Sequence, residues 1–177
     1  AVPALALDSE HWQQADPAAA RGVEYLRSTQ AEDGSWSAKS GPAITALIMG
    51  ALLDRPDISA NDPTVEKALK FILSFVKEDG SIHHGSLENY NTSICLAALA
   101  KINNRPEVAL VIRNAQEYIK NSQWRHGMTD PKGATVDENH PFYGGIGYGK
   151  HGRPDMSNLQ LALEGLYESG VDCNDPV

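Results

Sequence analysis

A short turn sequence recurs along this 177-residue chain and constrains its fold more than any other feature. The first copy is Gln30-Ala-Glu-Asp-Gly-Ser-Trp36, and the second is Lys77-Glu-Asp-Gly-Ser-Ile82. A third, looser copy reads Gln123-Trp-Arg-His-Gly-Met128. Each copy follows a segment with helical periodicity, and Asp-Gly is typical of helix ends and tight turns because glycine adopts a positive φ at no steric cost. The recurrence predicts a chain built from helical repeats.

Each unit is predicted to hold a helix before the turn and a second helix after it. The first helix is expected to run from Pro17 to about Thr29, because Asp16 is a good N-cap and proline suits the first helical position. Its expected inward residues are Val23, Tyr25 and Leu26. In the second helix, apolar residues at helical spacing and apolar neighbours predict burial on nearly all sides. These residues are Ile44, Leu47, Ile48, Ala51 and Leu52.

The units align at a period of about 46 residues, because Tyr25, Phe71 and Tyr118 fall at one position of the repeat. The segments 45–52, 92–99 and 159–166 also align. This pattern predicts an all-α fold of α/α hairpin repeats. The expected organisation is an N-terminal extension (1–15) and a repeat domain (16–177) with units 16–60, 61–105 and 106–173. Because Asn174-Asp-Pro-Val177 echoes Asn61-Asp-Pro-Thr64, a fourth unit is expected to start at 174–177.

Composition excludes several classes of partner. The chain is 41% hydrophobic and 21% charged, which is typical of a globular domain with one core. Its net charge of −8 disfavours nucleic acid and anionic membrane surfaces. A spanning helix is not expected, since no run of about 20 apolar residues occurs. Two cysteines, Cys95 and Cys173, make no disulfide framework, and the compartment stays open.

The turn sequence at 30–36 resembles the Gln…Gly-x-Trp repeats of the squalene–hopene cyclase branch of the terpenoid-cyclase and protein-prenyltransferase superfamily. Tyr143-Gly-Gly-Ile-Gly-Tyr-Gly149, followed by Asp155-Met-Ser-Asn158, is similar to the prenyltransferase and squalene-oxidase repeat proteins of that superfamily. The resemblance covers residues 16–177. It implies part of an (α/α) toroid, in which parallel inner helices enclose a central cavity. It also implies structural roles for the turn residues Gln30, Gly34, Trp36, Gly80 and Gly127.

Three hairpins do not close such a ring, so we expect self-association or completion by further repeats. In a toroid the N-termini of the inner helices converge on one mouth, where their partial positive charge gathers. Glu88 and Asp155 align at these positions, as an acid–base pair or as helix caps. Expected substrate contacts are Tyr90, Asn91, Ser157, Asn158, His83, His84 and Tyr148. The alternatives without a functional role are that the two histidines are solvated side chains and that Tyr148 packs within a stiff turn.

Two catalytic motifs of the superfamily are altered. Asp155-Met-Ser-Asn158 keeps only the first acid of an Asp-x-Asp-Asp motif, so the proton donor of the cyclases is missing. Tyr90-Asn91-Thr92 has asparagine where the zinc-binding histidine of the prenyltransferases belongs, and asparagine is a poor zinc ligand. The polar segment 128–154 has no tight metal-ligand spacing. No cofactor and no metal site are therefore predicted.

Three functions stay open. One is a cyclase- or prenyltransferase-like enzyme that acts on an apolar isoprenoid chain, although 7% aromatic residues are few for stabilising carbocations. Another is a non-catalytic toroid that binds a lipid or a protein. The third is a carboxylate-dependent, glycan-active toroid enzyme.

Overall fold

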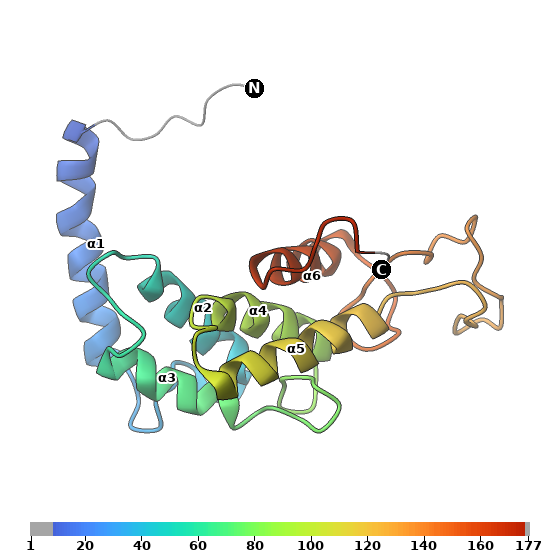
Figure 1. The fold of residues 1–177 in the computed structure, drawn as a ribbon, viewed down its shortest axis with the longest axis horizontal. Coiled ribbons are helices and arrows are strands. Elements are labelled where there is room, and N and C mark those ends of the chain that lie inside the picture. The colour runs from blue at the N-terminus through green and yellow to red at the C-terminus, as the bar shows by residue number, and fades with distance from the viewer. Residues whose placement is uncertain (1–8, 176–177) are drawn as a thin grey trace.

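The computed structural model describes residues 9–175, and within this range the fold is all-helical with no named strand. Figure 1 shows the helices in a row, with the first one upright at one end. The elements are α1 (Ser9–Thr29), the 3₁₀-helix η1 (Ala38–Ser40), α2 (Pro42–Leu53), α3 (Pro63–Leu73), α4 (Glu88–Ala100), α5 (Pro106–Asn121) and α6 (Met156–Glu168). None of the helices in this range is long and apolar enough to cross a membrane.

The three helices that follow the turns pack against one another, with α4 in the middle between α2 and α6. Outside them, α3 packs on α2 and α5 packs on α4. Small residues allow the close approach of α4 and α6, since a Cβ on Gly165 would lie 2.8 Å from the carbonyl oxygen of Ser93. The core is apolar, and its large, fully buried side chains include Met49, Leu52, Ile72, Ile82, Leu96, Leu99, Ile102 and Ile119.

The first helix begins at Ser9 and not at Pro17, so part of the expected N-terminal extension is helical. Asp16 does not cap it, because the residue lies inside the helix, and its carboxylate accepts a hydrogen bond from Arg55 at 3.0 Å. Pro17 lies inside the helix at an exposed position, where proline removes one backbone hydrogen bond. The inward placement of Tyr25 was also wrong: the side chain is 68% exposed, while Val23 is buried.

The first two turns have the same internal hydrogen bonds. In the first turn, the Ala31 amide donates to Ser35 O at 3.0 Å, and the Gly34 amide donates to Ala31 O at 2.9 Å. The Asp33 carboxylate accepts from the amide and the hydroxyl of Ser35, at 3.0 and 2.7 Å. These bonds explain why the turn needs aspartate two residues before serine. In the second turn the corresponding residues are Lys77, Asp79, Gly80 and Ser81.

The glycines of these two turns touch α3 and α5, each of which comes one α-helix later than the α-helix that directly follows the turn. Gly34 has φ +89°, and a Cβ there would lie 2.2 Å from the carbonyl oxygen of Lys67 in α3. Gly80 has φ +87°, and its Cβ would lie 2.4 Å from the carbonyl oxygen of Asn114 in α5. Both the backbone conformation and the space therefore require glycine.

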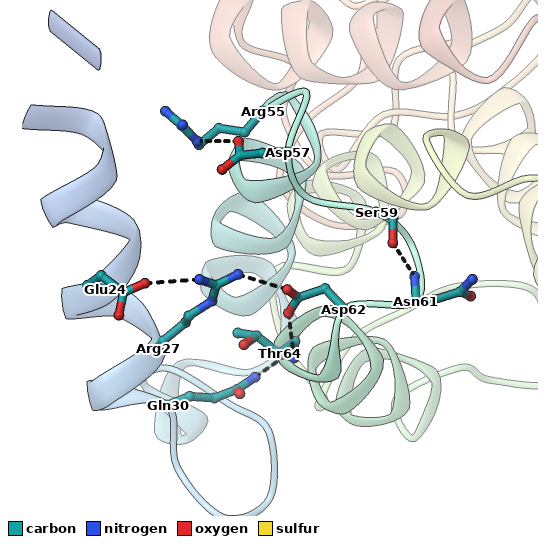
Figure 2. Close-up of polar contacts among 9 residues, drawn as sticks. All are labelled: Glu24, Arg27, Gln30, Arg55, Asp57, Ser59, Asn61, Asp62 and Thr64. Carbon is teal, nitrogen blue, oxygen red and sulfur yellow. Dashed lines mark hydrogen bonds and ion pairs between the residues drawn. The ribbon is translucent and has the colours of Figure 1, made fainter. Parts of the chain in front are cut away.

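The side chains around the first turn hold α1 to the start of α3, as Figure 2 shows. Gln30 Nε2 donates to the carbonyl oxygens of Gly34 and Thr64, at 3.0 and 2.9 Å. Arg27 donates to the carboxylate of Asp62 at 2.8 Å. Trp36 Nε1 donates to the carbonyl oxygen of residue 26 at 3.0 Å, so the turn is also anchored to its own helix.

The third turn lies elsewhere than expected. The amide of Trp124 donates to Gly145 O at 3.0 Å, and the amide of Gly144 donates to Trp124 O at 2.8 Å. Gln123 Nε2 donates to Gly144 O at 3.1 Å, as Gln30 does to the glycine of the first turn. The counterpart of that glycine is therefore Gly144, and the long segment 125–143 stands where the first turn has only Glu32 and Asp33. Gly127 has φ +85° but belongs to a separate turn inside this segment.

The burial expected for nearly all sides of α2 was also wrong for one stripe. Leu47 is 50% exposed, and Ala51 is exposed one turn further on. Within residues 9–175, α2 packs mainly against α3 and α4, with a smaller contact to η1, and this stripe faces away from them.

Candidate functional site

The exposed stripe of α2 lines an open groove of about 660 Å³ that crosses α2, α4 and α6. Its floor consists of small and aliphatic side chains, because close helix packing places alanine and glycine there. The apolar lining residues are Ala46, Leu47, Gly50, Ala51, Leu53, Ile94, Ala97, Ala98 and Leu161. No aromatic residue of the described chain lines this groove.

The rim of the groove is acidic. Lys101 forms an ion pair with Asp54 and donates to the carbonyl oxygen of Gly50 at 3.2 Å, so its charge is already balanced. Glu164 and Glu168 lie one turn apart on α6, and neither forms an ion pair within residues 9–175. The field at the rim therefore disfavours anions.

One polar group interrupts the apolar lining. The hydroxyl of Ser93 is buried and has no hydrogen-bond partner in the described part of the chain. A buried hydroxyl without a partner costs free energy, and the Ser93 hydroxyl lies below the surface of the groove.

At the start of α6, Asp155 is a helix cap. Its carboxylate accepts from the Asn158 amide at 2.9 Å, from the Asn158 side chain at 2.7 Å and from the Ser157 hydroxyl at 2.6 Å. These bonds, the one from Ser157 first, lower the pKa of Asp155. The capping alternative thus describes Asp155, and its predicted neighbours Ser157 and Asn158 complete the cap.

At the start of α4, the glycine-rich segment supplies the cap in place of a side chain. The N-cap residue Leu87 has φ +53° and makes no side-chain cap. Instead, the amide of Asn89 donates to the carbonyl oxygen of Tyr148 at 2.9 Å. The buried side chain of Asn89 donates to the carbonyl oxygens of Gly147 and Gly149, at 2.9 and 3.0 Å. Asn89 therefore locks this segment onto the helix.

The other candidates at this end of α4 have different surroundings. Glu88 lies against the glycine-rich segment, since a Cβ on Gly149 would be 2.5 Å from its Oε2 atom. The rings of Tyr90 and Tyr148 are 6.1 Å apart, and the Tyr148 side chain is 48% exposed. Asn91 is buried and donates to the carbonyl oxygens of residues 86 and 87. Tyr148 thus belongs to the contact between the segment and α4.

The two histidines face different groups. His83 is half-buried, and burial lowers its pKa, while the carboxylate of Glu88 acts in the opposite direction. Its Nδ1 atom accepts from the amide of Gly85 at 2.8 Å. His84 is exposed and belongs to the loop before α4. Its ring lies beside the start of α2, since a Cβ on Gly41 would be 2.9 Å from its Nδ1 atom.

A charged group that the sequence reasoning overlooked lies nearby. The ammonium of Lys150 is 5.7 Å from the ring centroid of Tyr118. Burial raises the pKa of Tyr118 to about 12, and the carboxylates of Glu88 and Asp79 add to the shift. His83, Glu88, Tyr118 and Lys150 thus form one polar cluster at α4, whereas the Asp155 cap is self-contained. No group of three or more His, Cys, Asp or Glu side chains in residues 9–175 is placed to hold a metal ion.

The groove was missed as a site feature. Helix α2 is apolar on nearly all sides in sequence, so periodicity did not single out its exposed face. A usable signal was the one-turn spacing of small residues, Ala46 with Gly50, beside acids spaced in the same way, Glu164 with Glu168.

Comparison with family models, with curated proteins and with solved structures finds no match to this chain.

Proposed function

We propose that the chain is part of an (α/α) toroid of the terpenoid-cyclase and prenyltransferase type. We further propose that its groove binds a neutral, extended apolar ligand of the isoprenoid class. The order of the helices supports the first statement, because α4 lies between α2 and α6, while α3 packs on α2 and α5 packs on α4. The recurring hydrogen bonds of the turns support it as well.

The single observation that carries the ligand assignment is the lining of the groove. Alanine and glycine bring the helix surfaces close to a bound chain, and the aliphatic residues add apolar contact. Burying each methylene group of a ligand contributes about 0.8 kcal/mol. The acidic rim favours a neutral chain over a prenyl diphosphate, whose charge Glu164 and Glu168 would repel.

Binding without turnover fits the groups present. Hydrogen bonds hold Asp155 in its ionised form, so it is a poor proton donor for cyclisation. Cyclisation also needs aromatic faces to stabilise carbocations, and glycan enzymes usually stack sugars on such faces. The described lining of the groove offers none. A scaffold that binds an apolar chain is therefore the function that the geometry supports best.

The test is to block the groove. Ala51→Trp fills it with a large side chain, while Ala19→Trp places the same side chain on the exposed surface of α1 as a matched control. Squalene should raise the Tm of the original chain and of Ala19→Trp but not of Ala51→Trp. Farnesyl diphosphate should give a smaller shift. Equal shifts in both variants, or no shift in the original chain, would contradict the proposal.

A further inference from the structure

Contacts that join the first predicted unit to the second recur on the far side of the third unit, residues 106–173. We call this side the edge, and we call the contact between the first two units the first junction. At that first junction, Arg27 donates to Asp62, whose carboxylate also caps α3 by accepting from the Thr64 amide at 2.8 Å. At the edge, Lys120 donates to Asp175 at 2.6 Å. Both aspartates stand between asparagine and proline, and both cations lie two residues after a tyrosine of the repeat. Asp175 therefore occupies the position of a residue that introduces a helix.

The glutamine at this edge has a free bonding position. Gln30 donates both to the carbonyl oxygen of Gly34 in its own turn and to that of Thr64 in the first turn of α3. Gln123 makes the first of these bonds, to Gly144 O, and makes no second one in the described part of the chain. The donor that spans the first junction is thus unused at the third.

The glycine at this edge is also uncovered. A Cβ on Gly34 or on Gly80 would lie within 2.4 Å of a backbone carbonyl oxygen, in α3 and in α5 respectively. Their counterpart Gly144 has φ +74°, but nothing among residues 9–175 lies within 4 Å of a Cβ there. The turn thus has the same shape without the helix that covers it in the two earlier units.

The inner side of the same edge is apolar and open. Helix α6 lies on α4, and its outward face borders a shallow hollow of about 760 Å³. Three large apolar side chains on this helix are more than half exposed, Met156, Leu163 and Tyr167. Such a face is typical of a surface that packs against another helix.

From these contacts we propose that the edge docks one further helical hairpin of the same kind, joined to the chain through Asp175. The first helix of that hairpin covers Gly144 and accepts the second hydrogen bond of Gln123. Its second helix packs on α6 as α6 packs on α4. The inference rests on the junction contacts and does not depend on the ligand proposed for the groove.

The experiment extends the chain after Val177 with a copy of residues 65–105, because Asn174-Asp-Pro-Val177 matches Asn61-Asp-Pro-Thr64 in register. Gly144→Asn is made with and without the extension. Gly133→Asn is the matched control, since Gly133 also has a positive φ and open surroundings. Asparagine tolerates this backbone conformation, so strain is similar in both variants.

The extended chain should show added helical signal in far-UV circular dichroism and a Tm several degrees higher. Gly144→Asn should remove most of that gain, whereas Gly133→Asn should keep it, and neither should matter much without the extension. An extension without added helix or Tm, or an equal effect of both substitutions, would overturn the proposal. So would a dimer of the unextended chain that Gly144→Asn disrupts, because the occupant would then be a second copy.

Discussion

Buried asparagine side chains organise the starts of α4 and α6. Asn89 donates to two carbonyl oxygens, which a carboxylate cannot do, and Asn158 donates to the capping Asp155. The amide oxygens of Asn89, Asn91 and Asn158 are buried and have no partner within residues 9–175. At this scale, Asp155 caps the start of α6, and Asn89 holds a loop against the start of α4.

The cap of α6 gives a pH dependence at the residue scale. The pKa of Asp155 is lower in the folded chain than in the unfolded chain, so its stabilisation is present above the unfolded value of about 3.9. This stabilisation is lost as the pH falls through the folded value. Asp155→Ala should therefore cost about 1 kcal/mol of unfolding free energy near neutral pH. In urea unfolding, the difference from the original chain should shrink below about pH 4. Glu138→Ala, an exposed loop substitution, should show no such trend, and a constant difference for Asp155→Ala would contradict the assignment.

Helices and turns were predictable from sequence where local chemistry decides their limits. The limits of α6 follow from local chemistry, since Asp155 caps its start and Gly170 with a positive φ follows its end. The start of α1 was not predictable, because Asp16-Pro17 is also tolerated within an exposed helix. The third turn was misplaced because an insertion separates Gln123 from its glycine, and fixed spacing then selects Gly127. The groove depends on which face of α2 stays uncovered, which only the packing decides.

Turn-to-helix contact can be separated from backbone strain by comparing two glycines. Gly80 and Gly127 have nearly equal φ, +87° and +85°, but only Gly80 faces a carbonyl oxygen. Alanine at either site should cost about 1 kcal/mol for the left-handed backbone. Gly80→Ala should lose about 1–3 kcal/mol more because α5 must shift. Chemical denaturation of the two variants checks this, and equal losses would show that the turn does not bear on α5.

Considered as a whole, the described chain is a row with α4 at its centre. Helix α4 packs against α2, α5 and α6, while α1 stands at one end of the row. Helices at the ends of a row have fewer packed neighbours than those in the middle, so the ends should open first. Backbone amides of α4 should therefore exchange most slowly with deuterium and those of the first turns of α1 fastest. Uniform protection along the row would contradict this, because it would mean that the units unfold only together.

The segment 125–143 is a loop whose two flanking residues, Trp124 and Gly144, are joined by a backbone hydrogen bond. Its length is thereby uncoupled from helix packing, since doubling a closed loop costs only about 0.6 kcal/mol. This excursion is consequently the position at which a fluorescent reporter or an affinity epitope can be spliced in while the helical frame keeps its register.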